Sequence, residues 1–182
     1  MKVLVVYGTV EGQTRKIADY VADRLRGAGH EVDVLDAASS RSVERSYGAA
    51  VLAGSIHVGR HSRALARYAH ANRDWLNAMP TLFLSISLSV ASKSEQTREA
   101  ARRLAAKFQD DTGFAARSTA CVAGALRYSR YNPLKRLVMR RISRAEGRET
   151  DTSRDYEYTD WQALGVHVAA FAATLASSIR NS

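Results

Sequence analysis

The sequence predicts an α/β protein built on a doubly wound, parallel sheet with helices on both faces. The chain alternates between short apolar runs and longer segments whose apolar residues recur at helical spacing. The short runs are apolar at consecutive positions, which is typical of strands buried on both faces. The 182 residues are 46% hydrophobic and contain no internal repeat or Pro/Gly-rich linker. One domain spanning residues 1–182 is therefore expected.

The first apolar run, residues 3–7, predicts a strand that leads through a short polar loop into a helix. The loop carries hydroxyls at Thr9 and Thr14 and a conformationally permissive Gly12. Unpaired amides at a helix N-terminus, with the helix dipole behind them, form a site for an anion. The loop has no lysine, which suits a single phosphate. The alternative is that Thr14 does no more than cap the helix.

Four further strands and three further helices follow in alternation. We expect the strands at residues 30–35, 49–53, 81–92 and 118–126, and the helices at 63–75, 95–108 and 160–178. Polar loops are expected from Ser55 to His61 and from Ser87 to Ser92. In parallel sheets of this kind the ligand lies outside the carboxyl ends of the strands, where these two loops and the first one meet.

The positive charge of the chain is concentrated in one segment. The formal net charge is +9, and residues 127–148 hold eight basic residues and one acidic residue. A basic amphipathic helix is expected from Leu134 to Arg144. This helix either packs its apolar side on the domain or docks on an anionic membrane surface. Nucleic acid is disfavoured because no aromatic platform or nucleic-acid fold accompanies the charge. The lone Cys121 lies in an apolar run, which favours a structural thiol in a reducing compartment.

The loop TVEGQT at residues 9–14 resembles the phosphate loop of flavodoxin-like proteins, T-x-T-G-x-T, which holds the phosphate of FMN. Glu11 departs from this pattern, because a carboxylate replaces a hydroxyl. The resemblance implies a flavodoxin-like, five-stranded parallel sheet in the order 2-1-3-4-5. We expect the inserted basic helix before the last helix, within an insertion at about 127–158.

A narrower resemblance covers nearly the whole chain. The strings EGQTRKIADY, GSIHVGRHSRAL, LNAMP, CVAGALRYSRY and GRETDTSRDYEYTDW are similar to those of the menaquinone-dependent protoporphyrinogen IX dehydrogenases of bacterial haem synthesis. This resemblance implies an FMN enzyme that oxidises protoporphyrinogen IX to protoporphyrin IX and passes electrons to menaquinone or ubiquinone. It also implies a cytoplasmic protein that associates peripherally with the inner membrane.

The same resemblance implies a set of site residues. His57, Arg127 and Arg130 are candidates to bind substrate or tune the flavin, with Arg127 and Arg130 on the two propionates and Tyr128 or Tyr131 against the macrocycle. No metal site is expected. The expected cofactor-binding residues are Thr9, Val10, Glu11, Gly12, Gln13, Thr14, Ser55, Ile56, His57, Ser87, Leu88, Ser89, Gly124, Ala125, Leu126 and Tyr128.

Two other functions stay open at this point. The first is a flavodoxin-like FMN quinone reductase or electron-transfer protein that does not act on porphyrinogens. The second is a flavodoxin fold without a cofactor that serves as a membrane-bound interaction module, an alternative that Glu11 favours. The sequence leaves the choice of quinone and the oligomeric state open.

Overall fold

The computed structural model describes residues 1–9, 12–39, 45–130, 137, 144 and 151–180. The strands are β1 (Lys2–Gly8), β2 (Glu31–Asp36), β3 (Ala49–His57), β4 (Arg60–His61), β5 (Thr81–Ser87), β6 (Ser118–Ala123), β7 (Ala125–Leu126) and β8 (Tyr156–Glu157). The helices are α1 (Gln13–Gly27), α2 (Arg63–Ala71), α3 (Arg73–Asn77), α4 (Glu95–Thr112) and α6 (Trp161–Arg180), with 3-10 turns at η1 (Leu88–Ala91) and η2 (Tyr128–Arg130).

The main sheet has the order β2-β1-β3-β5-β6, and these five strands are parallel. The two-residue strand β4 only folds back on the end of β3 in an antiparallel pair. With β4 set apart, the order is the predicted 2-1-3-4-5, so the predicted fold is confirmed. The chain leaves β1 towards β2 on one side and returns to β3 on the other. This reversal places the switch point at the carboxyl ends of β1 and β3.

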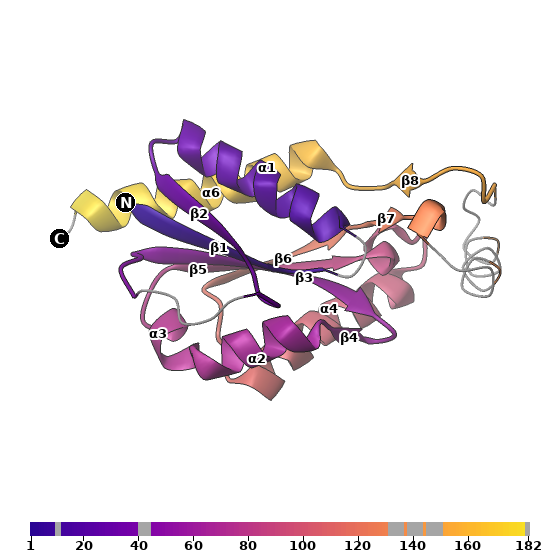
Figure 1. Cartoon of the computed structure of the whole chain (residues 1–182), viewed down its shortest axis with the longest axis horizontal. Helices are drawn as coiled ribbons and strands as arrows, with labels where there is room; N and C mark the ends of the chain where they lie inside the picture. The colour runs from indigo at the N-terminus through magenta and orange to yellow at the C-terminus, as the bar shows by residue number, and fades with distance from the viewer. Residues whose placement is uncertain (10–11, 40–44, 131–136, 138–143, 145–150, 181–182) are drawn as a thin grey trace.

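Helices cover both faces of the sheet (Figure 1). The helices α1 and α6 lie on one face, and α2, α3 and α4 lie on the other. Alternate residues of each strand point to opposite faces, so each strand contributes to two cores. Val3 and Val5 pack in the core that contains Ile17 and Leu164, whereas Leu4 packs in the core of the opposite face.

Close packing under α2 fixes the geometry at the ends of β1 and β3. A Cβ atom on Gly54 would lie 2.6 Å from Cδ2 of Leu65, and a Cβ atom on Gly8 would lie 2.8 Å from Cβ of the same leucine. Real Cβ atoms do not approach so closely, so α2 can pack this near the sheet only over glycine. The two glycines lie opposite each other in the register of β1 and β3.

Two predicted boundaries on the amino-terminal side are wrong. The segment after Gly54 is not a loop, because β3 continues to His57 and turns back through β4. The predicted helix at 63–75 is two helices, α2 and α3, which meet at Asn72. The side-chain amide of Asn72 donates to the Tyr68 carbonyl oxygen at 2.9 Å. A side chain that bonds to a backbone carbonyl of its own helix competes with the helical hydrogen bonds and favours a break between two helices.

Two predicted strands are too long. The strand predicted at 81–92 ends at Ser87 and continues as η1. The strand predicted at 118–126 ends at Ala123, because Ala125 and Leu126 pair with β8 instead of the main sheet. We call this two-stranded unit, β7 with β8, the ribbon.

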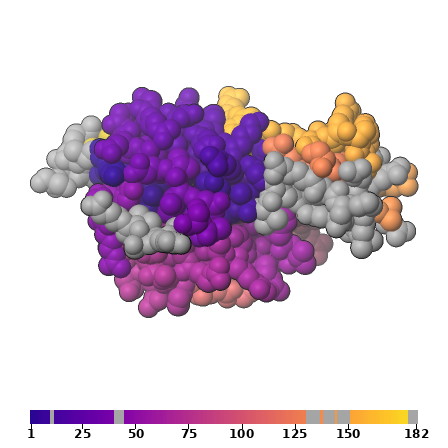
Figure 2. Space-filling view, viewed as in Figure 1, coloured from indigo at the N-terminus to yellow at the C-terminus, as the bar shows by residue number. Residues whose placement is uncertain are grey.

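The predicted basic helix from Leu134 to Arg144 lies outside the described residues, apart from Leu137 and Arg144 themselves. Both of these are exposed. None of the helices that the structure describes is long and apolar enough to cross a membrane. Figure 2 shows orange atoms from the region of the ribbon projecting at one end of the molecule.

Candidate functional site

The three predicted loops follow strand ends that lie in register at one edge of the sheet. Gly8 pairs with Gly54, Gly54 with Ser85, and Ser85 with Cys121, so these four residues form one row across the sheet. The residues after this row are Thr9, the end of β3, Ser87 with η1, and the end of β6. Parallel strands therefore bring the three predicted segments to the same edge, and the segment after β6 joins them there.

The loop after β1 has the backbone of an anion site. Gly12 has a left-handed φ of 90°, and its N–H donates to Oγ1 of Thr9 at 2.9 Å. Helix α1 begins at the next residue, so the amides of its first turn have no partner within the helix. The hydroxyl of Thr14 is buried and has no hydrogen-bond partner among the described residues. A buried, unsatisfied hydroxyl beside free amides fits a bound phosphate oxygen.

Gln13 does not direct its side chain towards solvent. The side chain is buried, Oε1 accepts from Nη2 of Arg127 at 2.9 Å, and Nε2 donates to Oγ1 of Thr159 at 3.0 Å. Only the backbone amide of Gln13 therefore remains to face the loop. The structure thus brings the predicted phosphate loop into direct contact with the predicted candidate Arg127.

The segments after β5 and β6 also meet. The Gly124 N–H donates to the Ser87 carbonyl oxygen at 3.3 Å, and Oγ of Ser87 accepts from the Ser89 N–H at 3.1 Å. Leu126 is buried, and so is Tyr128, whose ring packs edge-on against Tyr156. The ring of Tyr128 presents no exposed face here, so the prediction that Tyr128 or Tyr131 lies against the macrocycle now depends on Tyr131, which lies outside the described residues.

The remaining predicted residues lie at the end of β3 and in the insertion. Ser55, Ile56 and His57 are half-buried, and Oγ of Ser55 donates to the Gly8 carbonyl oxygen at 3.5 Å. Val10, Glu11, Tyr131 and the side chain of Arg130 lie outside what the structure describes.

Two acidic residues before α6 join the site without having been predicted. Asp155 accepts from the N–H of Ser129 at 2.9 Å and lies 3.7 Å from Nη1 of Arg127. Burial raises the pKa of Asp155, but these hydrogen bonds and the guanidinium outweigh it and hold the pKa below its usual value. Glu157 pairs with Lys16 at 2.7 Å. The only sequence signal for these contacts is that both acids lie in the string ETDTSRDYEYTDW.

His61 belongs to the core and not to a ligand site. The ring is buried, packs at a tilt against the rings of Phe83 and Phe108, and its Nε2 lies 3.0 Å from Oγ of Ser85. Burial lowers the pKa of His61 to about 4, so the ring is neutral at neutral pH. The described residues hold no cluster of His, Cys, Asp or Glu that could bind a metal.

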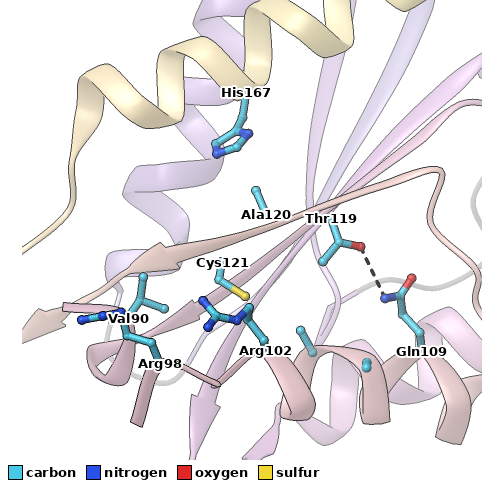
Figure 3. Close-up of a pocket in the computed structure, with 10 residues that line it drawn as sticks. Val90, Arg98, Arg102, Gln109, Thr119, Ala120, Cys121 and His167 are labelled. Carbon is cyan, nitrogen blue, oxygen red and sulfur yellow. Dashed lines mark hydrogen bonds between the residues drawn. The ribbon is translucent and has the colours of Figure 1, made fainter. Parts of the chain in front are cut away.

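A separate groove of about 500 Å³ runs along the outer edge of β6 (Figure 3). Arg98 and Arg102 line it from α4, Cys121 from β6, and His167 from α6. Both arginines are already paired with acidic residues of their own helix, Glu95 and Glu99. Burial raises the pKa of the Cys121 thiol, which disfavours the reactive thiolate form. The groove therefore lacks the features of a reaction site.

Comparison with known proteins identifies relatives along almost the entire chain. A flavodoxin domain family matches residues 4–153. The protoporphyrinogen IX dehydrogenase [quinone] of Escherichia coli K12 is 34% identical over 177 residues, which are 97% of this chain and 95% of that protein. A protein of the same name from Leishmania major is 32% identical over 174 residues, which are 94% of this chain and 75% of that protein.

Solved structures agree with this on the fold. A flavodoxin of Streptococcus pneumonia TIGR4 superimposes with a TM-score of 0.56 at 18% identity, and the match covers 98% of this chain and 99% of that one. Flavodoxin 1 from Bacillus cereus gives a TM-score of 0.53 at 14% identity over 95% of this chain and 98% of that one.

Proposed function

This chain belongs to the flavodoxin family, and from that premise we propose that it is an FMN-dependent oxidoreductase that oxidises protoporphyrinogen IX to protoporphyrin IX. The substrate gives up six electrons and six protons in three two-electron steps. The electrons pass on to a quinone. The names of the relatives state a quinone but not which one.

The observation that carries this proposal is the extent of the similarity. The match to the Escherichia coli protein covers 97% of this chain, and therefore includes most of the insertion at 127–158 as well as the flavodoxin core. A shared flavodoxin core alone would support no more than flavin binding. Agreement across the insertion supports the substrate as well.

The residues of the first loop suit the phosphate of FMN. The buried hydroxyl of Thr14 and the first amides of α1 would donate to the phosphate, and Gly12 permits the chain to turn into the helix. When bound, FMN supplies the two-electron redox chemistry, and the protein supplies binding, orientation and electrostatics. Segments 55–57, 87–89 and 124–126 lie at the same edge of the sheet and would border the ring.

The substrate carries two propionates, for which arginine is the suitable partner. Arg127 has one Nη bonded to Gln13 and the other 3.7 Å from Asp155, and its Nε is buried without a partner among the described residues. This arrangement holds the guanidinium in one place at the base of the insertion. We assign Arg127 to the placement of one propionate and Arg130 to the other.

A visible spectrum recorded under anaerobic conditions tests the function. The FMN-loaded protein is mixed with protoporphyrinogen IX, and the flavin absorbance is expected to fall as porphyrin absorbance rises. Protein that binds FMN but keeps its flavin absorbance would contradict the substrate. Reduction by NAD(P)H instead would favour a quinone reductase, and failure to bind FMN would favour a module without a cofactor.

The segment from Leu134 to Arg144 is proposed to dock the protein on the cytoplasmic face of the inner membrane, where the quinone is stored. Its basic residues would be attracted to anionic lipid by about 1 kcal/mol each. Sedimentation with vesicles of anionic lipid should carry the protein down, and vesicles of neutral lipid should not. Equal recovery with both would contradict this proposal.

A further inference from the structure

Gln13 is held by hydrogen bonds at both ends of its side chain. It is the first residue of α1 and only 5% exposed. Oε1 accepts from Arg127, and Nε2 donates to Thr159, whose hydroxyl in turn donates to the carbonyl oxygen of Ala123 at 2.8 Å. A glutamine that only began a helix would leave its side chain in solvent. This one connects three separate parts of the chain.

The partners of Gln13 are the two stems of the insertion. Arg127 lies directly after β7, and Thr159 lies two residues after β8. The stems are joined to each other by the ribbon and by Asp155, which accepts from both the N–H and the hydroxyl of Ser129, at 2.9 and 2.8 Å. Gln13 is therefore the buried link between the phosphate loop and the base of the insertion.

A second contact between α1 and the ribbon is a solvent-exposed ion pair. Lys16 pairs with Glu157 at 2.7 Å, and about half of the lysine side chain is exposed. An exposed pair of this type contributes little and is screened by salt. The hydrogen bond from Gln13 to Thr159 is buried and the one from Arg127 is partly buried, so breaking them leaves polar groups without partners, which is costly. Gln13 therefore supplies hydrogen bonds between α1 and both stems of the insertion that are less exposed to solvent than the Lys16–Glu157 pair.

We infer that Gln13 is a positioning residue that couples a phosphate bound at the first turn of α1 to the placement of Arg127 and the ribbon. This inference rests on the proposed function, because it takes the phosphate of FMN as the ligand of the loop. A phosphate that accepts from the amides of Gln13 and Thr14 restricts the backbone of that turn. Because the side chain of Gln13 is bonded to Arg127 and Thr159, a fixed backbone at Gln13 also limits the motion of these two residues. Binding of the cofactor and order at the base of the insertion then strengthen each other.

Riboflavin separates the phosphate from the rest of the cofactor, since it carries the same ring without a phosphate. Amide hydrogen exchange is measured on peptides that cover residues 124–129 and 156–159, with saturating FMN or saturating riboflavin. In the wild-type protein, FMN should slow exchange in these peptides about fivefold more than riboflavin does. In Gln13→Met, which keeps the length of the side chain but removes both hydrogen bonds, the two flavins should slow exchange equally.

Gln109→Met is the matched control. Gln109 also bonds at both ends of its side chain, to Thr119 and to the N–H of Ala116, but at the groove beside β6. This variant should keep the difference between FMN and riboflavin. If Gln13→Met does not fold, Thr159→Val removes the bond from Gln13 to Thr159 and keeps the bond to Arg127, and it should reduce the difference between FMN and riboflavin at residues 156–159.

The outcomes separate this inference from the proposed function. Wild-type protein that binds FMN but shows no difference between the two flavins at the ribbon overturns the inference alone. A Gln13→Met variant that keeps the full difference also overturns it. Wild-type protein that binds neither flavin overturns the proposed function, and the inference with it.

Discussion

The Nε2 atom of His61 lies 3.0 Å from the hydroxyl oxygen of Ser85, in a core closed by the rings of Phe83 and Phe108. The hairpin of β3 and β4 is thereby bonded to β5 beneath the strand ends that form the site. The imidazole is neutral there, since burial lowers its pKa to about 4.

This buried histidine should make the stability of the protein depend on pH. In the unfolded chain His61 has an ordinary pKa near 6.5, so the unfolded state binds more protons between pH 6.5 and about 4. The contribution of His61 is fully present above pH 6.5 and is lost as the pH falls through this window, by roughly 3 kcal/mol in total. Urea unfolding from pH 7.5 to 4.5 measures this loss.

The variant His61→Gln isolates the contribution of this residue, because glutamine can bond to Ser85 but does not titrate. Its stability should fall less steeply over the same pH range than that of the wild type. His167→Gln, at an exposed position of α6, should follow the wild-type curve. Parallel curves for His61→Gln and the wild type would show that His61 is not the group responsible.

Gly54→Ala should destabilise the fold because the added methyl group has no space. Its Cβ would lie 2.6 Å from Leu65 and 3.1 Å from the ring of His61. Overpacking of this kind typically costs about 2 kcal/mol. Gly27→Ala is the control: it lies at the end of α1 with no atom within 4 Å of the new Cβ, and it should gain about 0.5 kcal/mol. Equal unfolding midpoints for both variants in urea would contradict the packing argument.

Much of this fold could be predicted from residues that are neighbours in sequence. The apolar runs that form β1, β2 and β5 and the helical spacing of α4 and α6 are local patterns, because burial on a strand or helix imposes a period on nearby residues. The end of the fifth strand could not be predicted in this way. Ala120 to Leu126 is apolar throughout, and the break at Gly124 arises because the next two residues pair with β8, some 30 residues later.

In the site, too, local features could be predicted from the sequence and long-range contacts could not. The phosphate loop could be predicted because Thr9, Gly12 and Thr14 are close neighbours in the sequence. The contacts of Gln13 with Arg127 and Thr159 join residues 114 and 146 positions apart, and no local pattern encodes them. The burial of Tyr128 was missed for the same reason, since its partner Tyr156 belongs to the other strand of the ribbon.

Thr14→Val should have opposite effects on the flavin-free protein and on cofactor binding. The hydroxyl of Thr14 is buried and has no partner among the described residues, so replacing it with a methyl group should stabilise the flavin-free protein by about 1 kcal/mol. The same change removes a donor to the phosphate, so FMN should bind about tenfold more weakly and riboflavin equally well. Flavin fluorescence titrations and urea unfolding measure the two effects.

Thr112→Val provides the comparison for this prediction. Thr112 is buried too, but its hydroxyl donates to the carbonyl oxygen of Phe108 at 2.7 Å. Its removal should destabilise the protein and leave FMN affinity unchanged. If Thr14→Val lowered the affinity for riboflavin as much as for FMN, Thr14 would not be acting on the phosphate.

Val58→Asn should stabilise the protein, because Val58 is held in a conformation that valine disfavours. Its φ is 48°, and with Gly59 at 73° it forms the two-residue turn between β3 and β4. Both central positions of such a turn have positive φ, which Asn-Gly adopts readily and a β-branched residue does not. The side chain is 99% exposed, so no buried contact is lost. A gain of about 1 kcal/mol in the free energy of unfolding is expected.

The control for this change is Val166→Asn, at an exposed position within α6. Its backbone is helical, so asparagine should bring no gain there. Backbone strain is often found at functional sites, and this turn lies at the edge of the sheet that carries the proposed flavin site. A Val58→Asn protein that is more stable but binds porphyrinogen more weakly would show that Val58 contributes to substrate binding at the expense of stability. If Val58→Asn were no more stable than the wild type, the backbone of Val58 would not be strained.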